Sequence, residues 1–480
     1  MKGKLILFLI IILFYLLISG CAPKDTTPPQ VSITSPQNGQ TVSGIVTIQA
    51  LAIDNVGVLK VEFYIDENKV GEDTESPYSY DWDTTQYTNG IHKITAKAYD
   101  KAGNIRSVSI NVNIIGGINV WQKTFGGSSD DWANYIQQAY DKGYVVVGGT
   151  RSFGTGSSDV YILKLNEEGE KEWEKTFGGI NYEEAHIIHR TYDGGYIIAG
   201  YANGVYVIKL DINGQKEWEK ILGESWHDNA FYIHQTSDWG YIIVGYKYSY
   251  EKQNGQVYLI KLDRNGNKEW EKVYGENLDN IAYSICDTSD NGYIIVGCTL
   301  LLENGWDIYI LKVDSKGNKI WEKSLGGIGD DEGYSILITD DGGYLIAGLT
   351  TSLGAGNYDA YFVKINPYGE KVWDKTYGGV KIDKIYSLKK TIDGNYIAVG
   401  ETNSFGAGEN DIYIIKIDKN GNKLWEKTYG GSKNDVAYSI QQTNDGGYIV
   451  AGETNSFGAG DRDIYVIKMD SVGNTGPYPQ

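Results

Sequence analysis

A tryptophan-centred unit recurs seven times in the second part of the sequence, and this repetition constrains the fold more than any other feature. Each marker tryptophan opens a Trp-x-Lys-x-x-Gly pattern, and successive markers stand 45 to 52 residues apart. The markers are Trp121, Trp173, Trp218, Trp270, Trp321, Trp373 and Trp425. Such a period is the signature of a repeat architecture, in which each unit buries its apolar surface against its neighbours.

One unit contains four strand-length segments. In the last copy each is rich in aromatic and β-branched residues, and they span 424–429, 437–443, 447–452 and 463–470. Short turns such as Asn444-Asp445-Gly446 place glycine where a tight hairpin needs a positive φ. The blades of a β-propeller are four-stranded sheets and number about four to eight. The sequence therefore predicts a seven-bladed β-propeller over residues 118–474.

The phase of the repeat predicts how the ring closes. The array opens with a segment of the outer, tryptophan-bearing type (118–125) and ends near Asp470 with an incomplete set. We therefore expect this N-terminal segment to complete the last blade, which removes both free sheet edges. In the same order, the segment that begins at Ala437 is the innermost strand of its blade.

The loops between blades, and those between the second and third strands of each blade, are expected to share one face, which we call the variable-loop face. Two copies carry the same loop there (402–408 and 454–460), whereas the third and fourth copies replace it with aromatic residues. Departure from a repeated pattern indicates function, and exposed aromatic side chains suit a glycan or an extended peptide. Drift of the repeat is the alternative. The candidate ligand-binding residues are Trp226, His227, Tyr246, Tyr248, Tyr250 and Trp306.

Three residues with metal-binding side chains occupy one aligned position in consecutive copies: His189, His234 and Cys286. The other copies carry Gln137, Leu337, Lys389 and Gln441 there. Imidazole and thiolate ligands suit zinc or copper, and polar residues lining a wet channel are the alternative. The sequence contains no Gly-x-Ser-x-Gly, phosphate-binding Gly-Lys-Ser/Thr or His-Glu-x-x-His motif, so no catalytic residue is predicted.

These units resemble the β-propeller repeats of bacterial and archaeal surface proteins. The stretch 418–425 also resembles the tryptophan-docking motif of pyrroloquinoline-quinone-type propellers, where the tryptophan packs between blades. The resemblance leaves two alternatives to a binding role: an enzyme that acts on glycans or uses a quinone, and an envelope scaffold similar to the lipoprotein propeller of the outer-membrane β-barrel assembly machinery. One fold hosts many functions.

Residues 30–115 form a separate unit of short alternating strands with turn signals between them. This pattern predicts an immunoglobulin-like β-sandwich. The segments 54–57 and 99–104 resemble the bacterial Ig-like domains of surface proteins and secreted hydrolases, which implies a spacer or adhesive module. Asp54, Asp66 and Asp100 could bind calcium at one end of the domain, and turn formation is the alternative reading of these residues.

The first twenty residues read as a targeting segment. Lys2 and Lys4 precede an apolar run over 5–17, which is short against the roughly 20 residues of a membrane span. The sequence 18–21 resembles the bacterial lipoprotein signal, which implies that Cys21 is acylated and anchors the mature chain to the membrane. A short polar linker (21–29) follows, and an uncleaved membrane anchor is the alternative.

Charge and cysteine content limit the partners. The formal charge of −19 would repel phosphate backbones, which excludes nucleic acid. Three cysteines make no disulfide framework, and the offset of Cys286 from Cys298 across their hairpin argues against a bond between them. We therefore expect a lipid-anchored extracytoplasmic protein that binds or adheres to a glycan or protein through its variable-loop face.

Overall fold

The computed structural model describes residues 25–223, 225–275 and 278–479. The predicted signal peptide and Cys21 lie outside these residues. The chain divides into two compact units, Met1–Ile118 and Asn119–Gln480. Apart from one 3-10 turn (Thr84–Gln86), every element of the described residues is a β-strand. No helix in this part of the chain is long and apolar enough to cross a membrane.

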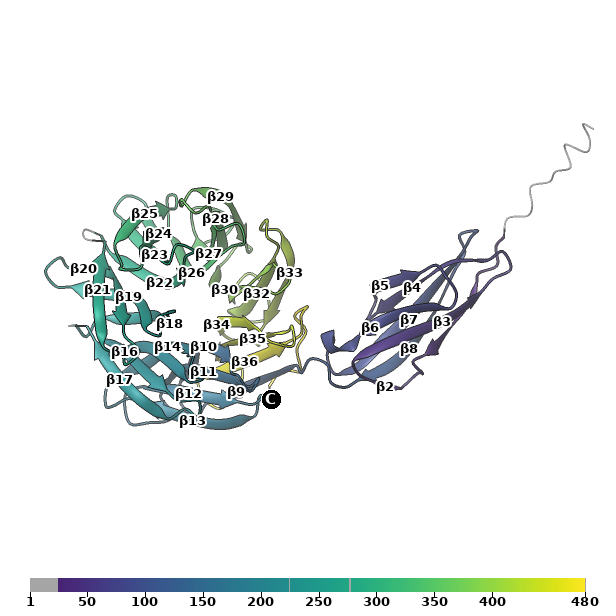
Figure 1. The fold of residues 1–480 in the computed structure, drawn as a ribbon, viewed down its shortest axis with the longest axis horizontal. Helices are drawn as coiled ribbons and strands as arrows, with labels where there is room; N and C mark the ends of the chain where they lie inside the picture. Colours follow the sequence, from purple (N-terminus) through teal and green to yellow (C-terminus); the bar gives the residue numbers. More distant parts are fainter. Residues whose placement is uncertain (1–24, 224, 276–277, 480) are drawn as a thin grey trace, which may run out of the picture. The chain divides into compact units, whose positions relative to one another are not determined.

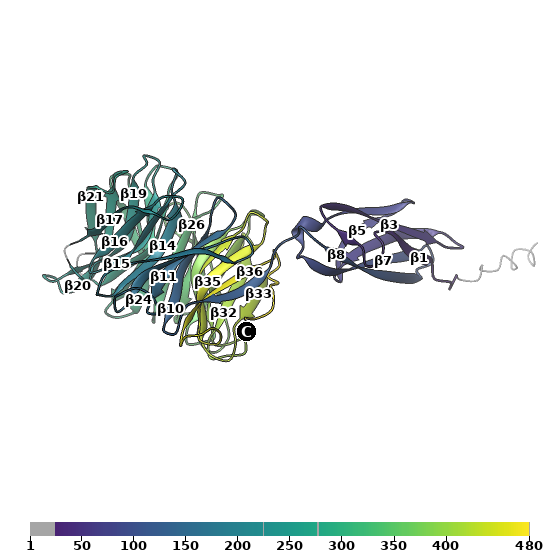
Figure 2. The same cartoon turned by 90° about the horizontal axis from the view of Figure 1, so that it is seen from below.

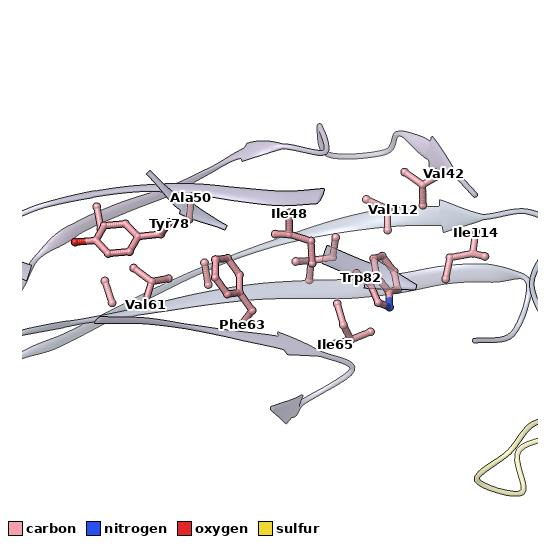
Figure 3. Close-up of a cluster of buried hydrophobic side chains, with 14 residues drawn as sticks. Val42, Ile48, Ala50, Val61, Phe63, Ile65, Tyr78, Trp82, Val112 and Ile114 are labelled. Atoms are coloured by element: carbon pink, nitrogen blue, oxygen red, sulfur yellow. The ribbon is translucent and has the colours of Figure 1, made fainter. Parts of the chain in front are cut away.

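The first unit is a β-sandwich of two sheets. One sheet has the order β1 (Gln30–Ser35), β3 (Ile45–Ile53) and β6 (Tyr78–Asp83). The other has the order β2 (Thr41–Val42), β8 (Ile105–Ile114), β7 (Gly90–Asp100), β4 (Val58–Ile65) and β5 (Asn68–Asp73). Side chains alternate along each strand, so Ile48, Phe63 and Trp82 meet between the sheets and form the core (Figure 3).

The second unit contains seven four-stranded antiparallel sheets within the described residues. The first sheet consists of β10 (Asp131–Gln138), β11 (Tyr144–Thr150), β12 (Asp159–Leu165) and β13 (Lys171–Phe177), and the second of β14 (Glu183–Arg190), β15 (Tyr196–Ala202), β16 (Val205–Leu210) and β17 (Lys216–Leu222). The third sheet consists of β18 (Asn229–Gln235), β19 (Tyr241–Ser249), β20 (Asn254–Leu262) and β21 (Lys268–Tyr274). The fourth consists of β22 (Asn280–Asp287), β23 (Tyr293–Leu301), β24 (Gly305–Val313) and β25 (Lys319–Leu325).

Three further sheets complete this unit. The fifth sheet consists of β26 (Asp331–Ile338), β27 (Tyr344–Thr350), β28 (Asp359–Ile365) and β29 (Lys371–Tyr377). The sixth consists of β30 (Asp383–Lys390), β31 (Tyr396–Thr402), β32 (Asp411–Ile417) and β33 (Lys423–Tyr429). The last consists of β34 (Asp435–Gln442), β35 (Tyr448–Thr454), β36 (Asp463–Met469) and β9 (Trp121–Phe125). The sheets follow one another around a centre, with their first strands innermost, which is the arrangement of a β-propeller (Figures 1 and 2).

The ring closes as the phase of the repeat predicted. β9 pairs antiparallel with β36, with Phe125 opposite Ile464 and Trp121 opposite Lys468. The innermost strands of the last and first sheets also join, since the backbone N–H of Gln138 donates to the Gln441 side-chain oxygen at 2.8 Å. The prediction that the N-terminal segment completes the last sheet is therefore confirmed.

An ion pair inside each sheet repeats around the ring. A lysine of the third strand reaches a carboxylate in the turn between the first and second strands, with Nζ–O distances of 2.6 to 3.0 Å. The pairs are Lys164–Asp141, Lys209–Asp193, Lys261–Asp238, Lys312–Asp290, Lys364–Asp341, Lys416–Asp393 and Lys468–Asp445. Apart from this lysine and an opening aspartate, the third strands β12 and β36 consist of apolar and tyrosine residues and are buried on both faces, so each lysine there needs a partner.

The marker tryptophans join neighbouring sheets. Each lies against a glycine in the turn that follows the third strand of the next sheet, and Trp121 meets Gly169 in this way. A Cβ added at these glycines would lie 2.6 to 3.3 Å from a tryptophan ring atom, and their φ values are between +72° and +83°. Glycine thus serves both the left-handed turn and the close approach of the ring.

Candidate functional site

The structure brings four of the six candidate ligand-binding residues together on the variable-loop face. Trp226 and His227 stand in the loop before β18, and Tyr248 and Tyr250 stand at the end of β19 and just beyond it. Ring centroids are 3.6 Å apart for Trp226 and His227, 5.0 Å for His227 and Tyr248, and 5.1 Å for Tyr248 and Tyr250. We call these four residues the aromatic loop cluster. Trp226 is 60 % exposed and Tyr250 54 %, so the rings face solvent.

A long hairpin and one aspartate position this cluster. β19 and β20 have nine residues each, whereas the equivalent strands of the first sheet have seven, so the hairpin extends further. Asp228 connects the two loops, because its carboxylate accepts hydrogen bonds from the backbone N–H groups of Ser225 and Tyr248, both at 3.2 Å. Asp228 therefore ties the loop that carries Trp226 and His227 to the end of β19.

The other two candidates lie apart from the cluster. Tyr246 stands opposite Asn229 in the sheet, and its ring covers Gly255, where an added Cβ would lie 2.0 Å from it. Burial raises the pKa of the Tyr246 hydroxyl. Trp306 belongs to the next sheet, where its backbone N–H donates to Asp330 at 3.1 Å. Among the described residues, no ring contact joins either residue to the cluster.

Sequence analysis missed an aromatic row that continues the cluster toward the first sheet. Trp132 stacks on Tyr182 with 6.4 Å between centroids and 18° between planes, and Tyr182 contacts Tyr201 at 6.2 Å. The Tyr201 hydroxyl donates to the backbone oxygen of Trp226 at 2.8 Å, which joins the row to the cluster. Neither Trp132 nor Trp226 belongs to the repeated marker tryptophans. This departure from the repeat is the feature of the sequence that distinguishes Trp132.

A second feature that the sequence did not reveal surrounds the centre of the ring. Every first strand contains a β-bulge at its fourth or third residue, and the bulged side chains line a cavity of about 190 Å³. Six of the seven are aromatic and contact one another in series, with centroids 5.0 to 5.4 Å apart. We call them the aromatic collar: His186, Phe231, Tyr283, Tyr334, Tyr386 and Tyr438. Asn134 holds the seventh position.

The collar had a signal in the second strands. Each of these strands carries a glycine opposite its bulge, such as Gly148 and Gly297, where an added Cβ would lie 1.9 Å and 1.8 Å from a backbone oxygen of the first strand. An isolated glycine inside a strand pattern marks a bulge, and a bulge re-aims one side chain. The repeated glycine is therefore the sequence feature that marks the bulged residues, whose side chains point into the centre.

Carboxylates stand beside the collar hydroxyls. Tyr334 donates to Glu332 at 2.8 Å, and Tyr386 donates to Glu401 at 2.6 Å. Burial raises the pKa of Glu332 and of Glu453, because both carboxylates lose contact with water. Basic side chains accompany two of these carboxylates, since Lys384 pairs with Glu401 at 3.3 Å and Arg462 with Glu453 at 3.1 Å.

His189, His234 and Cys286 occupy equivalent register positions, opposite Ile197, Ile242 and Ile294. They do not form a metal-binding group: in the described residues, the cluster of three or more His, Cys, Asp or Glu ligand atoms within 4.8 Å of one another consists of Asp25, Asp54 and Asp100. His234 instead contacts Asp287 at 3.0 Å.

Protonation at these positions follows from burial. Burial and the neighbouring Lys389 charge lower the pKa of His189, and burial raises the pKa of the Cys286 thiol to about 12. Both groups are therefore neutral at neutral pH. Cys286 and Cys298 are free cysteines, which confirms that no disulfide joins them.

The aspartates of the sandwich differ from the predicted set. Asp66 stands in the β4–β5 turn, where it contacts His92 at 2.5 Å, whereas Asp54 and Asp100 stand at the other end of β4. Asp25 takes the third place beside them, and one oxygen each of Asp25 and Asp54 is buried without a hydrogen-bond partner. The expected grouping of Asp66 with Asp54 and Asp100 is wrong, because the eight residues of β4 separate the two turns.

Among the comparisons with known proteins, a family match covers part of the first unit. Residues 29–96 match the bacterial Ig domain family. The regulatory protein FlaEY of Caulobacter vibrioides is 23 % identical over 159 residues, which are 28 % of this chain and only 17 % of that protein. The match therefore spans less than a fifth of FlaEY.

Solved structures are similar to each unit. The second unit is similar to the Dos1 propeller, with 12 % identity, a TM-score of 0.46, and coverage of 75 % of this chain and 97 % of that one. It is also similar to the Neurospora crassa Pan2 WD40 domain, with 11 % identity, a TM-score of 0.45, and coverage of 74 % of this chain and 99 % of that one. The first unit is similar to fibronectin(III)-like modules of Clostridium thermocellum CbhA, with 28 % identity, a TM-score of 0.17, and coverage of 18 % of this chain and 96 % of that one. Residues 29–96 thus match a bacterial Ig domain, and the four-stranded sheets of the second unit have by themselves the arrangement of a β-propeller.

Proposed function

We propose that this chain is a lipid-anchored, extracytoplasmic binding protein whose seven-bladed propeller holds a glycan on its variable-loop face. The observation that carries the proposal is the aromatic loop cluster, in which Trp226 and Tyr250 present exposed rings on a hairpin longer than its counterpart in the first sheet. Aromatic rings offer a flat apolar surface to the C–H face of a sugar, and their polar edges serve its hydroxyls.

The shape of the aromatic surface suits an extended ligand. The cluster continues through Tyr201, whose hydroxyl donates to the Trp226 backbone oxygen, to Tyr182, which is 36 % exposed and stacks on the buried Trp132. Single exposed aromatics need no explanation, but a contiguous group on one face indicates a binding surface. The formal charge of −19 favours a neutral glycan over an acidic one.

The first unit and the N-terminal sequence support the location. A bacterial Ig domain is a common module of extracellular and surface proteins, and the sequence 18–21 resembles a lipoprotein signal. In this proposal the sandwich is a spacer between the anchor at Cys21 and the propeller. Labelling with a radioactive or clickable fatty acid, compared between wild type and Cys21→Ser, tests the anchor.

Glycan-array binding of the full chain tests the ligand. Trp226→Ala and Tyr250→Ala should each weaken binding about tenfold or more, since exposed aromatic anchors carry much of the energy of such contacts. Trp239→Ala is the matched control, because Trp239 is a 49 % exposed tryptophan at the opposite end of β18. Equal losses for Trp226→Ala and Trp239→Ala, or binding only to a peptide array, would contradict the glycan proposal.

A further inference from the structure

One partly buried lysine at the central cavity lacks the carboxylate partner that the third-strand lysines have. Lys389 lies on β30, and its Nζ is 3.1 Å from the Tyr135 hydroxyl and 5.5 Å from the centroid of the same ring. In the part of the chain that the structure describes, no ion pair within 4.0 Å involves Lys389. The third-strand lysines differ, since each reaches an aspartate in its own sheet.

The groups around Lys389 do not neutralise its charge. His189 and Tyr232 are close enough to interact with it electrostatically, and burial keeps the imidazole uncharged and the phenol protonated at neutral pH. The Nε2 atom of His189 is buried and has no hydrogen-bond partner. The carboxylate of Asp287 is engaged by His234 at 3.0 Å. A cation that is partly withdrawn from water and has no counter-charge is costly, and an anion from outside would offset that cost.

The rest of the cavity suits the body of a small ring. Its volume is about 190 Å³, and it is lined by the aromatic collar and by the hydroxyl-bearing residues Ser284, Ser335 and Ser387. For comparison, an engineered protein cavity of about 150 Å³ takes up benzene. The collar side chains face the cavity, and Lys389 lies three residues beyond the collar residue Tyr386 on β30.

We propose that this cavity binds a small ring-bearing monocarboxylate, with the carboxylate on Lys389 and the ring against the aromatic collar. A single ammonium, without an arginine fork, matches one carboxylate rather than a phosphate dianion, for which proteins use several donors. The ring is aromatic or a pyranose, as in benzoate or glucuronate. This site is independent of the aromatic loop cluster and of its glycan.

Isothermal titration of the full chain tests the proposal with benzoate, glucuronate, their neutral counterparts benzyl alcohol and glucose, and inorganic phosphate. At least one of the two acids should bind, and its neutral counterpart should bind about tenfold more weakly or less. Lys389→Met should weaken the acid about tenfold or more, because it removes a partly buried charge from the contact. Lys390→Met is the matched control: Lys390 is the next residue, exposed and paired with Asp340.

Each outcome decides the matter. Binding of one acid only identifies whether the ring is aromatic or a sugar. Binding of neither acid at millimolar concentration, equal binding by Lys389→Met and wild type, or tighter binding of phosphate overturns the proposal. Thermal unfolding verifies that Lys389→Met is folded, and its glycan-array signal should equal that of wild type, which separates this site from the variable-loop face.

Discussion

The Nζ atom of Lys468 lies 2.8 Å from a carboxylate oxygen of Asp445, and the lysine side chain is completely buried. The pair joins the third strand of the last sheet to the turn between its first two strands. Burial lowers the pKa of Lys468. Burial alone would raise the pKa of Asp445, but the Lys468 charge and the hydrogen bonds from Thr443 and Gly447 hold it below its ordinary value.

Removing the carboxylate should therefore destabilise the propeller. Asp445→Asn leaves a buried ammonium without a counter-charge, which we expect to cost about 3 kcal/mol in the free energy of unfolding. Asp340→Asn is the control, since the Lys390–Asp340 pair is exposed and should contribute less than about 1 kcal/mol. Urea unfolding of the full chain measures both. Similar losses in the two variants would show that burial does not set the strength of the pair.

The same pair sets a pH dependence. Because the folded pKa of Asp445 is lowered, its contribution is present above the ordinary aspartate range near pH 4 and disappears as pH falls through the folded pKa. The stability difference between wild type and Asp445→Asn should accordingly shrink in acid. A difference that stays constant from pH 7 to the lowest pH at which the protein folds would contradict this sign.

Contact between a marker tryptophan and the next sheet is testable at Gly317. Gly317 and Gly394 have similar φ values, +74° and +77°, but a Cβ at Gly317 would lie 2.8 Å from Trp270 whereas a Cβ at Gly394 has no atom within 4 Å. Gly394→Ala should cost about 1 kcal/mol for the left-handed backbone. Gly317→Ala should cost about 1 to 3 kcal/mol more, because the ring must move. If thermal unfolding shows the same loss of stability for Gly317→Ala and Gly394→Ala, the tryptophan ring moves aside without a cost in free energy.

Three of the described turns between a first and a second strand carry a non-glycine residue in a left-handed conformation: Lys142, Trp239 and Asn291. Lys142 has φ +71° and Asn291 φ +62°, at positions where other sheets have glycines such as Gly194 and Gly446. Lys142→Gly should raise the free energy of unfolding by about 1 kcal/mol, since the strain exceeds the entropy cost of glycine. Asn291→Gly should change it little, because asparagine tolerates this conformation. Chemical unfolding checks the pair, and a stabilisation of Asn291→Gly as large as that of Lys142→Gly would disprove the argument.

The buried carboxyl of Glu332, beside the collar, should respond to pH with the opposite sign to Asp445. Burial raises the folded pKa of Glu332, so the folded state binds more protons and loses stability as pH rises from the ordinary glutamate range through the folded pKa. The free energy of unfolding of Glu332→Gln, measured relative to that of wild type, should therefore be higher at pH 7 than at pH 4. Glu322 is the control: burial opposes its charge, but Lys319 and Tyr309 lower its pKa, so Glu322→Gln should lose stability at pH 7.

The repeat and its phase were enough to predict the sheets and the closure by β9, because both follow from the order of segments along the chain. The aromatic loop cluster was predicted in part, since Trp226 and Tyr248 interrupt the repeated loop. The collar tyrosines escaped notice because tyrosine is also a common strand residue. Their orientation depends on a bulge, which is a property of two paired strands.

Other errors have different physical causes. Asp25 joins Asp54 and Asp100 across more than 70 residues of sequence, and no local pattern marks such a contact. Lys389 was recognised only as one of the residues aligned with His189. Its lack of a carboxylate partner depends on which acidic groups the neighbouring strands bring near, and the aligned sequence does not contain that information.

The closure of the ring by β9 also determines when the protein can finish folding during synthesis. Gln122 of β9 and Tyr465 of β36 are hydrogen-bonded across 343 residues of chain. At roughly 5 to 20 residues per second, β9 leaves the ribosome tens of seconds before its partner strand exists. The first strand of the propeller must spend that interval with an unpaired edge, so the newborn chain is most exposed to wrong partners just before its last strand arrives.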